Sequence, residues 1–397
     1  MHRVQPINAQ QKWLALLLVG LAWQPLQAQE ANINLGGSWT LTPTLGLAVG
    51  YDDNLALSAT DPLSSEYVRI QPALRLDGGR GNHQLRAQYE LDQTEFRDSE
   101  FDDFADHELS GFWRWSPSVR HQLQLDASVG RFHDRRGEGL RENFAETLDL
   151  EVDEYRSDTV RVGYVFGAEG ARGRLGVFAE HSDKRYQNNR EFTAQGDYEQ
   201  QQVGGEFSWR VGVRTALLAR VTQAQTDYDS ANLDSDERAV AVGVRWDGSE
   251  KGDGRALVGR LDRDFDNEEL DGFAGSFWQL AASWRPVART QFSALSRRST
   301  DEAFGGSNLV VREELRLGWR HNWRPRFATS LDAAWLDEDF RPVGRDDEIR
   351  RFGVSADYQF RRWLLLGLGL RREQRDSPIA RFDYDRTELV LSAQLSL

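Results

Sequence analysis

The sequence contains no cysteine. This absence excludes a disulfide framework, a thiolate nucleophile and any metal site built on cysteine. Lysine is scarce too, at Lys12, Lys184 and Lys251, so arginine carries nearly all of the positive charge. A guanidinium stays charged and forms planar forks toward carboxylates. The formal net charge of −14 argues against nucleic-acid binding, which needs a basic surface.

Long apolar runs are also missing, except near the start of the chain. There, residues 13–23 are apolar, basic residues precede them, and Ala28 offers a small side chain at a cleavage position. Because this run is shorter than the roughly 20 residues of a spanning helix, it predicts a secretory signal peptide over residues 1–28. We expect a short N-terminal lead over residues 29–38 and one further domain over residues 39–397.

After this segment, the dominant pattern is an alternation of apolar and polar residues. A period of two predicts strands with one apolar and one polar face. Only alternate residues of a membrane barrel face lipid, so a mean hydropathy of −0.63 does not exclude a membrane protein. The clearest segments are residues 68–77, 84–92, 122–129, 352–360 and 388–397.

A soluble β-sandwich also alternates, but segment and connection lengths favour a membrane barrel. The segments approach the roughly 9–11 residues of a tilted membrane strand, and short connections alternate with longer, acidic ones. The short connections are residues 78–82, 116–120, 167–173 and 285–289, and the longer ones are 52–65, 97–105, 134–155, 184–198 and 227–237. We therefore predict an all-β, antiparallel outer-membrane β-barrel of about 18 strands, with both termini on the periplasmic side. A barrel of about 16 strands is the alternative, because residues 255–265 and 290–298 alternate poorly.

A repeated motif marks four strand ends. Trp115, Trp209, Trp284 and Trp323 are each followed by a short turn, after which an arginine (or Ala328) opens the next strand. Tryptophan and arginine at one level suit the lipid headgroup boundary. We predict that the four tryptophans belong to a membrane-interface girdle; the alternative is a chance similarity among turns in an arginine-rich chain.

Arginines and acids occupy polar positions of the alternating segments. Rings of charge on the lumen side set the selectivity of pores, and guanidinium forks could pair with the carboxylates of an anionic polysaccharide. Individually, most of these residues are expected to pair across strands and fill a polar interior. We predict that the following residues line the lumen and set its selectivity: Arg69, Arg75, Arg86, Glu90, Asp92, Arg114, Arg161, Arg220 and Arg245.

Catalytic and metal chemistry find little support. Asp262, Asp264 and Asp266 are spaced like the start of an EF-hand loop, but the required glycine is missing, so we expect no metal site. His181 and Ser182 are adjacent on a strand and must point to opposite faces, so they cannot form a catalytic pair within it. No nucleophile elbow, zinc motif or P-loop is present. We predict no enzymatic activity, no catalytic residue and no cofactor. A membrane-embedded hydrolase is the alternative.

A resemblance to a known family begins at Tyr51, Asp52, Asp53 and Asn54, where an alternating strand ends in G-Y-D-D-N. A loop rich in serine and aspartate follows, then the alternating, proline-containing strand V-R-I-Q-P-A-L-R-L, then a hairpin that ends near His107. Residues 40–135 in this way resemble the putative beta-barrel porin 2 family. Its members are similar to outer-membrane proteins of exopolysaccharide biosynthesis operons.

The resemblance implies an outer-membrane barrel of a Gram-negative bacterium, exported with a cleaved signal peptide, that acts in exopolysaccharide export or assembly. It supplies no catalytic residues. The expected partners are outer-membrane lipid and lipopolysaccharide, the barrel assembly machinery, an anionic polysaccharide and periplasmic export components. A general or solute-specific porin is the main alternative, with residues 134–155, then 52–65, as candidates for an inward constriction loop. A purely structural barrel is a further one.

Overall fold

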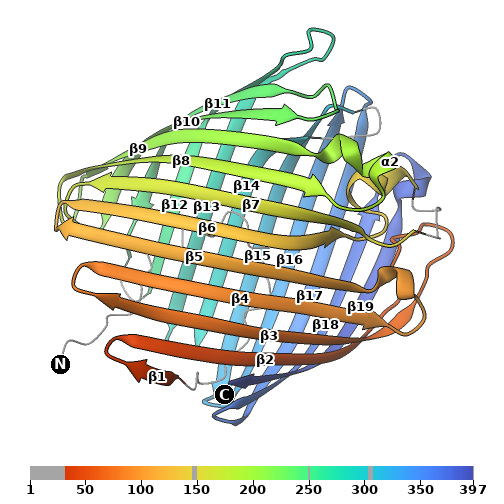
Figure 1. The fold of residues 1–397 in the computed structure, drawn as a ribbon, viewed down its shortest axis with the longest axis horizontal. Helices are drawn as coiled ribbons and strands as arrows, with labels where there is room; N and C mark the ends of the chain where they lie inside the picture. The colour runs from red at the N-terminus through yellow and green to blue at the C-terminus, as the bar shows by residue number, and fades with distance from the viewer. Residues whose placement is uncertain (1–31, 145–149, 249–250, 303–306, 397) are drawn as a thin grey trace.

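The computed structural model describes residues 32–144, 150–248, 251–302 and 307–396. The signal peptide predicted over residues 1–28 lies outside this part of the chain. Within it, eighteen strands, β2–β19, form one closed antiparallel barrel, as the alternation predicts (Figure 1). No helix in the described ranges is long and apolar enough to cross a membrane.

The strands are β1 (Ile33–Gly36), β2 (Trp39–Asp52), β3 (Ser65–Arg80), β4 (His83–Phe96), β5 (Phe104–Ser118), β6 (His121–Asp134), β7 (Asp153–Phe166), β8 (Gly173–Tyr186), β9 (Tyr198–Arg210), β10 (Thr215–Tyr228), β11 (Ser235–Trp246), β12 (Gly252–Phe265), β13 (Phe273–Val287), β14 (Thr290–Glu302), β15 (Leu309–Arg324), β16 (Phe327–Arg341), β17 (Arg345–Arg361), β18 (Leu364–Asp376) and β19 (Tyr384–Ser396). The helical segments are the single turns η1 (Glu100–Asp102), α2 (Arg190–Thr193), η3 (Ala194–Gly196) and η4 (Ala380–Phe382), and η2 (Gly139–Phe144).

Each strand separates an apolar outer face from a polar inner face. On β7, Val160, Val162 and Tyr164 are exposed on the outside of the barrel, while the alternating Thr159 and Arg161 point inward. Closing the sheet pairs each of β2–β19 on both sides, so the barrel wall has no open edge. The barrel therefore presents an apolar wall to lipid and a charged wall to its lumen.

The barrel closes between its first and last full strands. β19 pairs with β2 from Glu388 opposite Asp52 to Ser396 opposite Thr44. The short β1 adds to β2 beside this seam. Pro72 lies within β3, and the β3–β4 pairing is interrupted between Ile70 and Ala73, since proline has no N–H to donate.

The alternative of about 16 strands is wrong. Residues 255–265 lie in β12 and residues 290–298 in β14, and both strands pair with their neighbours over most of their length. Their weak alternation has a local cause, because arginines and small residues replace large apolar ones at some outward positions, as at Arg260 and Arg298.

The two ends of the barrel differ in their connections. Short turns join β3–β4, β5–β6, β13–β14, β15–β16 and β17–β18, whereas β2–β3, β6–β7 and β8–β9 are joined by long loops. These short turns lie at one end, here the turn end. The long loops lie at the other, the loop end, together with the short β16–β17 turn of residues 342–344 (Figure 1). In a bacterial outer-membrane barrel, short turns face the periplasm and long loops face outward.

Candidate functional site: the charged lumen and its loops

The predicted lumen arginines lie on the inner wall and contact acceptors there. Arg69 lies 3.5 Å from Asp92, and Arg75 and Arg86 both bind Asp77, at 2.8 and 2.7 Å. Most of these contacts join neighbouring strands, as expected, whereas Arg75 contacts an aspartate on its own strand. The remaining contacts are Arg114 with Gln84, Arg161 with Glu180 at 2.8 Å, Arg220 with Glu206 at 3.2 Å and Arg245 with Asp247 at 3.3 Å, while Glu90 is exposed and lies opposite Glu108.

A second set of inward ion pairs, which the sequence analysis did not single out, lines β14–β18. The Glu314 side chain is fully buried, accepts a hydrogen bond from Arg297 at 2.6 Å, and also contacts Arg316. Arg351 donates to Glu373 at 2.5 Å. A buried carboxylate is costly unless arginine forks satisfy it, so these pairs hold one another in place. The alternation along β14–β18 places these residues on the polar, inward face, and this pattern could have identified them from the sequence.

The β6–β7 loop folds inward and crosses the loop end of the lumen. At its start, Arg136 forms a buried pair with Asp102 of the β4–β5 loop, with Nε to Oδ1 at 2.6 Å. Further along, Glu142 accepts two hydrogen bonds from Arg345 of β17, both at 2.9 Å, and lies 2.5 Å from Arg375 of β18. The loop is thus anchored on two separate parts of the barrel. This is the inward position expected of a constriction.

The β2–β3 loop packs beneath it. Leu55, Ala56 and Leu57 are buried, although they lie in a connection and not in a strand. Gly137 has a φ of +77°, and a Cβ there would lie 2.4 Å from the Ala56 carbonyl oxygen, so only glycine fits between the two loops. A polar cavity of about 20 Å³ remains beside Leu55, enough for a single water. The two candidate constriction loops therefore pack against each other.

The family motif lies at the barrel seam. Asp52 is 1% exposed and binds Arg386 of β19, with Nε to Oδ2 at 2.8 Å. Asp53 exchanges two hydrogen bonds with the backbone of Thr387, as carboxylate acceptor and as N–H donor. Tyr51 points outward and is exposed, so it takes no part in this contact.

Asn54 completes the motif from inside. It is buried, and its amide group donates to the carbonyl oxygens of Ser58 and Asp385 at 2.9 and 3.0 Å. Its Oδ1 accepts the Ser58 N–H at 2.9 Å. Asp52, Asp53 and Asn54 therefore fasten the first long loop to the last strand, where the barrel closes.

The predicted girdle residues all lie at the turn end and face outward. Trp115, Trp209, Trp284 and Trp323 are 38%, 39%, 56% and 53% exposed, a position suited to a lipid interface. Arg172 stacks over the Trp209 ring at 5.0 Å. Sequence reasoning missed three further exposed tryptophans at this end, which also stand at strand ends or in a turn: Trp39, Trp246 and Trp363.

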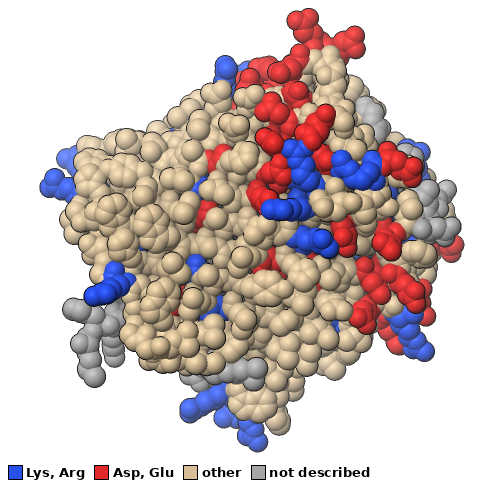
Figure 2. All heavy atoms as spheres, in the orientation of Figure 1, with Lys and Arg blue, Asp and Glu red and all other residues tan. Residues whose placement is uncertain are grey.

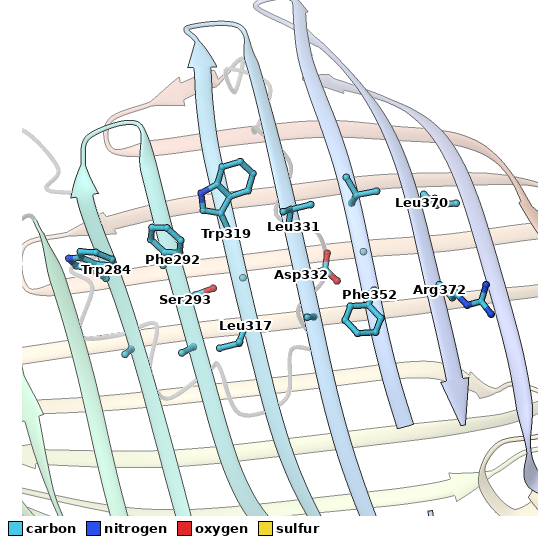
Figure 3. Close-up of a pocket in the computed structure, with 16 residues that line it drawn as sticks. Trp284, Phe292, Ser293, Leu317, Trp319, Leu331, Asp332, Phe352, Leu370 and Arg372 are labelled. Atoms are coloured by element: carbon cyan, nitrogen blue, oxygen red, sulfur yellow. The ribbon is translucent and has the colours of Figure 1, made fainter. Parts of the chain in front are cut away.

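A hollow of about 670 Å³ lies on the outer face of β13–β18 (Figure 3). Trp284, Phe292, Trp319, Phe352 and Leu370 surround it, and small alanines lie between them. Nearly all of its accessible lining is apolar, and its large side chains have the outward parity of the lipid-facing wall. We therefore assign this hollow to the lipid-facing surface and not to a solute site.

The residues weighed for catalysis do not come together. Ser182 points inward, where Thr159 donates to its hydroxyl at 3.3 Å, while His181 is exposed on the outer face. A further histidine, His133 of β6, contacts Asp106 at 2.9 Å and stacks on Phe104, away from both. Among the described residues, no three His, Asp or Glu side chains are placed to hold a metal ion.

Among solved structures, outer-membrane barrels share this fold. OpdK from Pseudomonas aeruginosa, solved with vanillate, matches with a TM-score of 0.51 and 12% identity over 90% of this chain and 99% of that one. A BenF-like porin from Pseudomonas fluorescens Pf-5 gives 0.52 and 11% over the same shares. The FrpB iron transporter from Neisseria meningitidis (F5-1 variant) gives 0.50 and 10%, over 86% of this chain and 62% of that one. This chain thus spans less than two thirds of FrpB, and identities this low show the fold alone.

No curated protein matches the sequence. A family model does, and its description is Putative beta-barrel porin 2. The match covers residues 31–397, well beyond the segment of residues 40–135 on which the resemblance was first seen. The closed barrel, its apolar outer wall and its porin-like neighbours agree with that family. The chain is therefore an outer-membrane β-barrel that belongs to the putative beta-barrel porin 2 family.

Proposed function

We propose that this barrel takes part in the export or assembly of an exopolysaccharide, which passes along its charged lumen. The observation that carries the proposal is the inner wall itself. Arginine and carboxylate side chains line it, as Arg69, Arg75 and Arg86 on β3–β4 and as Arg297 and Arg351 on β14 and β17. Such a wall offers hydrogen bonds to hydroxyls and forks to carboxylates along a polymer.

The family adds support of a different kind. The resemblance at Tyr51 to Asn54 implies kinship with outer-membrane proteins of exopolysaccharide operons, and the chain belongs to that family over residues 31–397. The charged lumen supports the chemistry of the proposal, and the resemblance implies the class of polymer.

The test is an in-frame deletion of the gene, followed by locating the polymer of the cell. Export predicts that polymer disappears from the medium and collects in the periplasm. Restoring the wild-type gene should return it to the medium. Normal secretion in the deletion strain would remove the export function.

A porin for small charged solutes is the second candidate, and the inward β6–β7 loop favours it. Glu142 fastens this loop to Arg345 and Arg375, which narrows the loop end of the lumen as a constriction does in a solute channel. This function predicts that deletion slows the uptake of small charged solutes and leaves polymer secretion unchanged. The two measurements on one deletion strain therefore separate the two functions.

A further inference from the structure

The two ends of the barrel carry opposite charge. Although the chain has a net charge of −14, every connection at the turn end has at least one cation in it or beside it. In Figure 2 basic side chains mark the left and lower rim of the visible face, while acidic side chains gather toward the loop end at the right and top. The cations of the turns, here the turn ring, are Arg80, Arg120, Arg172, Arg210, Arg214, Lys251, Arg285, Arg289, Arg324, Arg326, Arg361 and Arg362.

Most cations of the turn ring lack the carboxylate partners that other arginines of this chain have. Most arginines of the inner wall and of the loops contact a carboxylate, as Arg386 does with Asp52. In the described ranges, ten exposed arginines of the turn ring form no ion pair with a carboxylate: Arg80, Arg120, Arg172, Arg214, Arg285, Arg289, Arg324, Arg326, Arg361 and Arg362. These ten arginines carry charge of one sign and create a field that attracts polyanions.

Inside the barrel, five arginines on β7–β12 continue this positive charge from the turn end into the lumen. We call Arg161, Arg174, Arg220, Arg245 and Arg255 the lumen cluster. Arg245 and Arg255 stand directly opposite each other on β11 and β12. Like charges in opposite positions of a sheet repel, so this arrangement costs stability unless an anion lies nearby.

Four of the five arginines in the lumen cluster form ion pairs, and two of these four share one carboxylate. Arg161 pairs with Glu180 and Arg245 with Asp247, but Arg220 and Arg255 share Glu206.

Arg174 forms no ion pair with a carboxylate within the described chain. Arg245 and Arg210 repel it, while Glu169 and Asp247 attract it from farther away than an ion pair. The Nε–H groups of Arg174 and Arg255 are buried and have no acceptor among the described atoms. A buried donor without an acceptor is costly, so these groups mark a place prepared for an anionic ligand.

We propose that the turn ring and the lumen cluster together form a docking site for a carboxylate-bearing polysaccharide that enters from the periplasm. The inference rests on the proposed function and names its substrate class and its direction. The turn ring gathers the polyanion, and the lumen cluster takes its carboxylates in guanidinium forks. The acidic loop end repels it, which favours its release outward.

Anionic lipid headgroups share the ability to bind arginine, but they fit the geometry less well. They could reach the turn ring from the inner leaflet, near Trp209 and Trp284. They could not reach Arg174, Arg245 and Arg255, which point into the lumen. The unmet donors of the lumen cluster therefore favour a ligand that enters the barrel.

The test is a binding measurement on the folded full-length barrel in neutral detergent, which does not require the pore to conduct. The probe is a fluorescently labelled hexagalacturonate, with labelled maltohexaose as the neutral control. We expect R174Q/R245Q to weaken hexagalacturonate binding about tenfold, because two charge-assisted contacts are lost. R285Q/R289Q/R324Q/R326Q should weaken binding and reduce its dependence on salt. Folding of each variant is checked by heat-modifiable gel migration.

The matched control is R156Q/R260Q. It removes the same charge as R174Q/R245Q, but from arginines that face outward near the loop end beside Asp158 and Asp262. The control should bind the probe as the wild type does. Equal weakening in the control, or no selectivity over maltohexaose, would overturn the site. The site would also be overturned if the variants lost only their binding to phosphatidylglycerol vesicles, because the turn ring would then bind lipid headgroups.

Failure of this inference and of the proposed function can be told apart. If the variants lose hexagalacturonate binding while the deletion strain secretes polymer normally, the polyanion site stands and export falls. If deletion traps polymer but wild type and R174Q/R245Q bind the probe equally, export stands and this site is wrong.

Discussion

The contact between Glu142 and the barrel wall gives the sharpest prediction. Glu142 lies in the loop that crosses the lumen, and it binds Arg345 and Arg375, whose side chains are 6% and 7% exposed. Asp347 is the carboxylate that the two arginines also share. Replacing Glu142 with glutamine keeps the shape and one acceptor oxygen, but it removes the charge that holds the loop. The loop should then leave the wall more often.

The size of the effect follows from the burial of the pair. Removing one partner of a buried ion pair costs about 3–5 kcal/mol. Glutamine still accepts a hydrogen bond, and Glu142 keeps 18% exposure, so the loss should be smaller, about 2–3 kcal/mol. That range corresponds to a change of roughly 30- to 150-fold in the ratio of released to anchored loop.

Limited proteolysis with trypsin reads this ratio directly. Arg136 and Arg141 lie in the same loop and are buried, so trypsin reaches them only when the loop leaves the wall. When opening is fast relative to cleavage, the cleavage rate follows the released population, and E142Q should be cut tens of times faster than wild type. Single-channel recordings should show larger or noisier currents in the same variant. E138Q is the control, since Glu138 is exposed in the same loop and carries the same charge.

The anchoring argument would be refuted by a folded E142Q protein that trypsin cuts at the wild-type rate. It would equally fail if E138Q and E142Q changed together, because the effect would then follow loop charge in general and not the contact with the wall.

Three further predictions follow from the lumen, the seam and the girdle. Replacing Arg69, Arg75 and Arg86 together with glutamine leaves the carboxylates of Asp92 and Asp77 without their cations. The reversal potential in a salt gradient should then shift toward cation selectivity while the barrel stays folded. An unchanged potential and an unchanged export rate would contradict a selectivity role. N54A removes buried hydrogen bonds at the seam and should cost about 1–3 kcal/mol, seen as a lower temperature for the loss of the folded band on gels, whereas D61A at an exposed loop position should not. W284A/W323A should lower the fraction of protein that inserts into lipid vesicles, and W284F/W323F should keep much of the wild-type insertion. Equal insertion of the wild type and both variants would count against the girdle.

The period of two explains why the wall of the barrel could be predicted from sequence. Alternation is a local property, and one residue decides whether its neighbour faces lipid or lumen. The inward positions of Arg69, Arg161 and Arg220 follow from their parity alone. The strand number was harder, because β12 and β14 carry arginine at outward positions and their alternation is blurred.

The loops obey no such period, and their partners are remote in sequence. Glu142 meets Arg345 across 203 positions, and Asp52 meets Arg386 across 334, so each contact exists only after the barrel has closed. Length and acidity pointed to residues 134–155 as a constriction, but nothing local to Glu142 identifies the wall residues that hold it. The family motif shows the same limit. In the sequence, Asp52, Asp53 and Asn54 look like the start of a loop. In the structure, they bind the last strand of the barrel to the end of the first. A substitution there should therefore affect closure of the barrel before it affects anything in the lumen, which separates the role of the motif from that of the arginines.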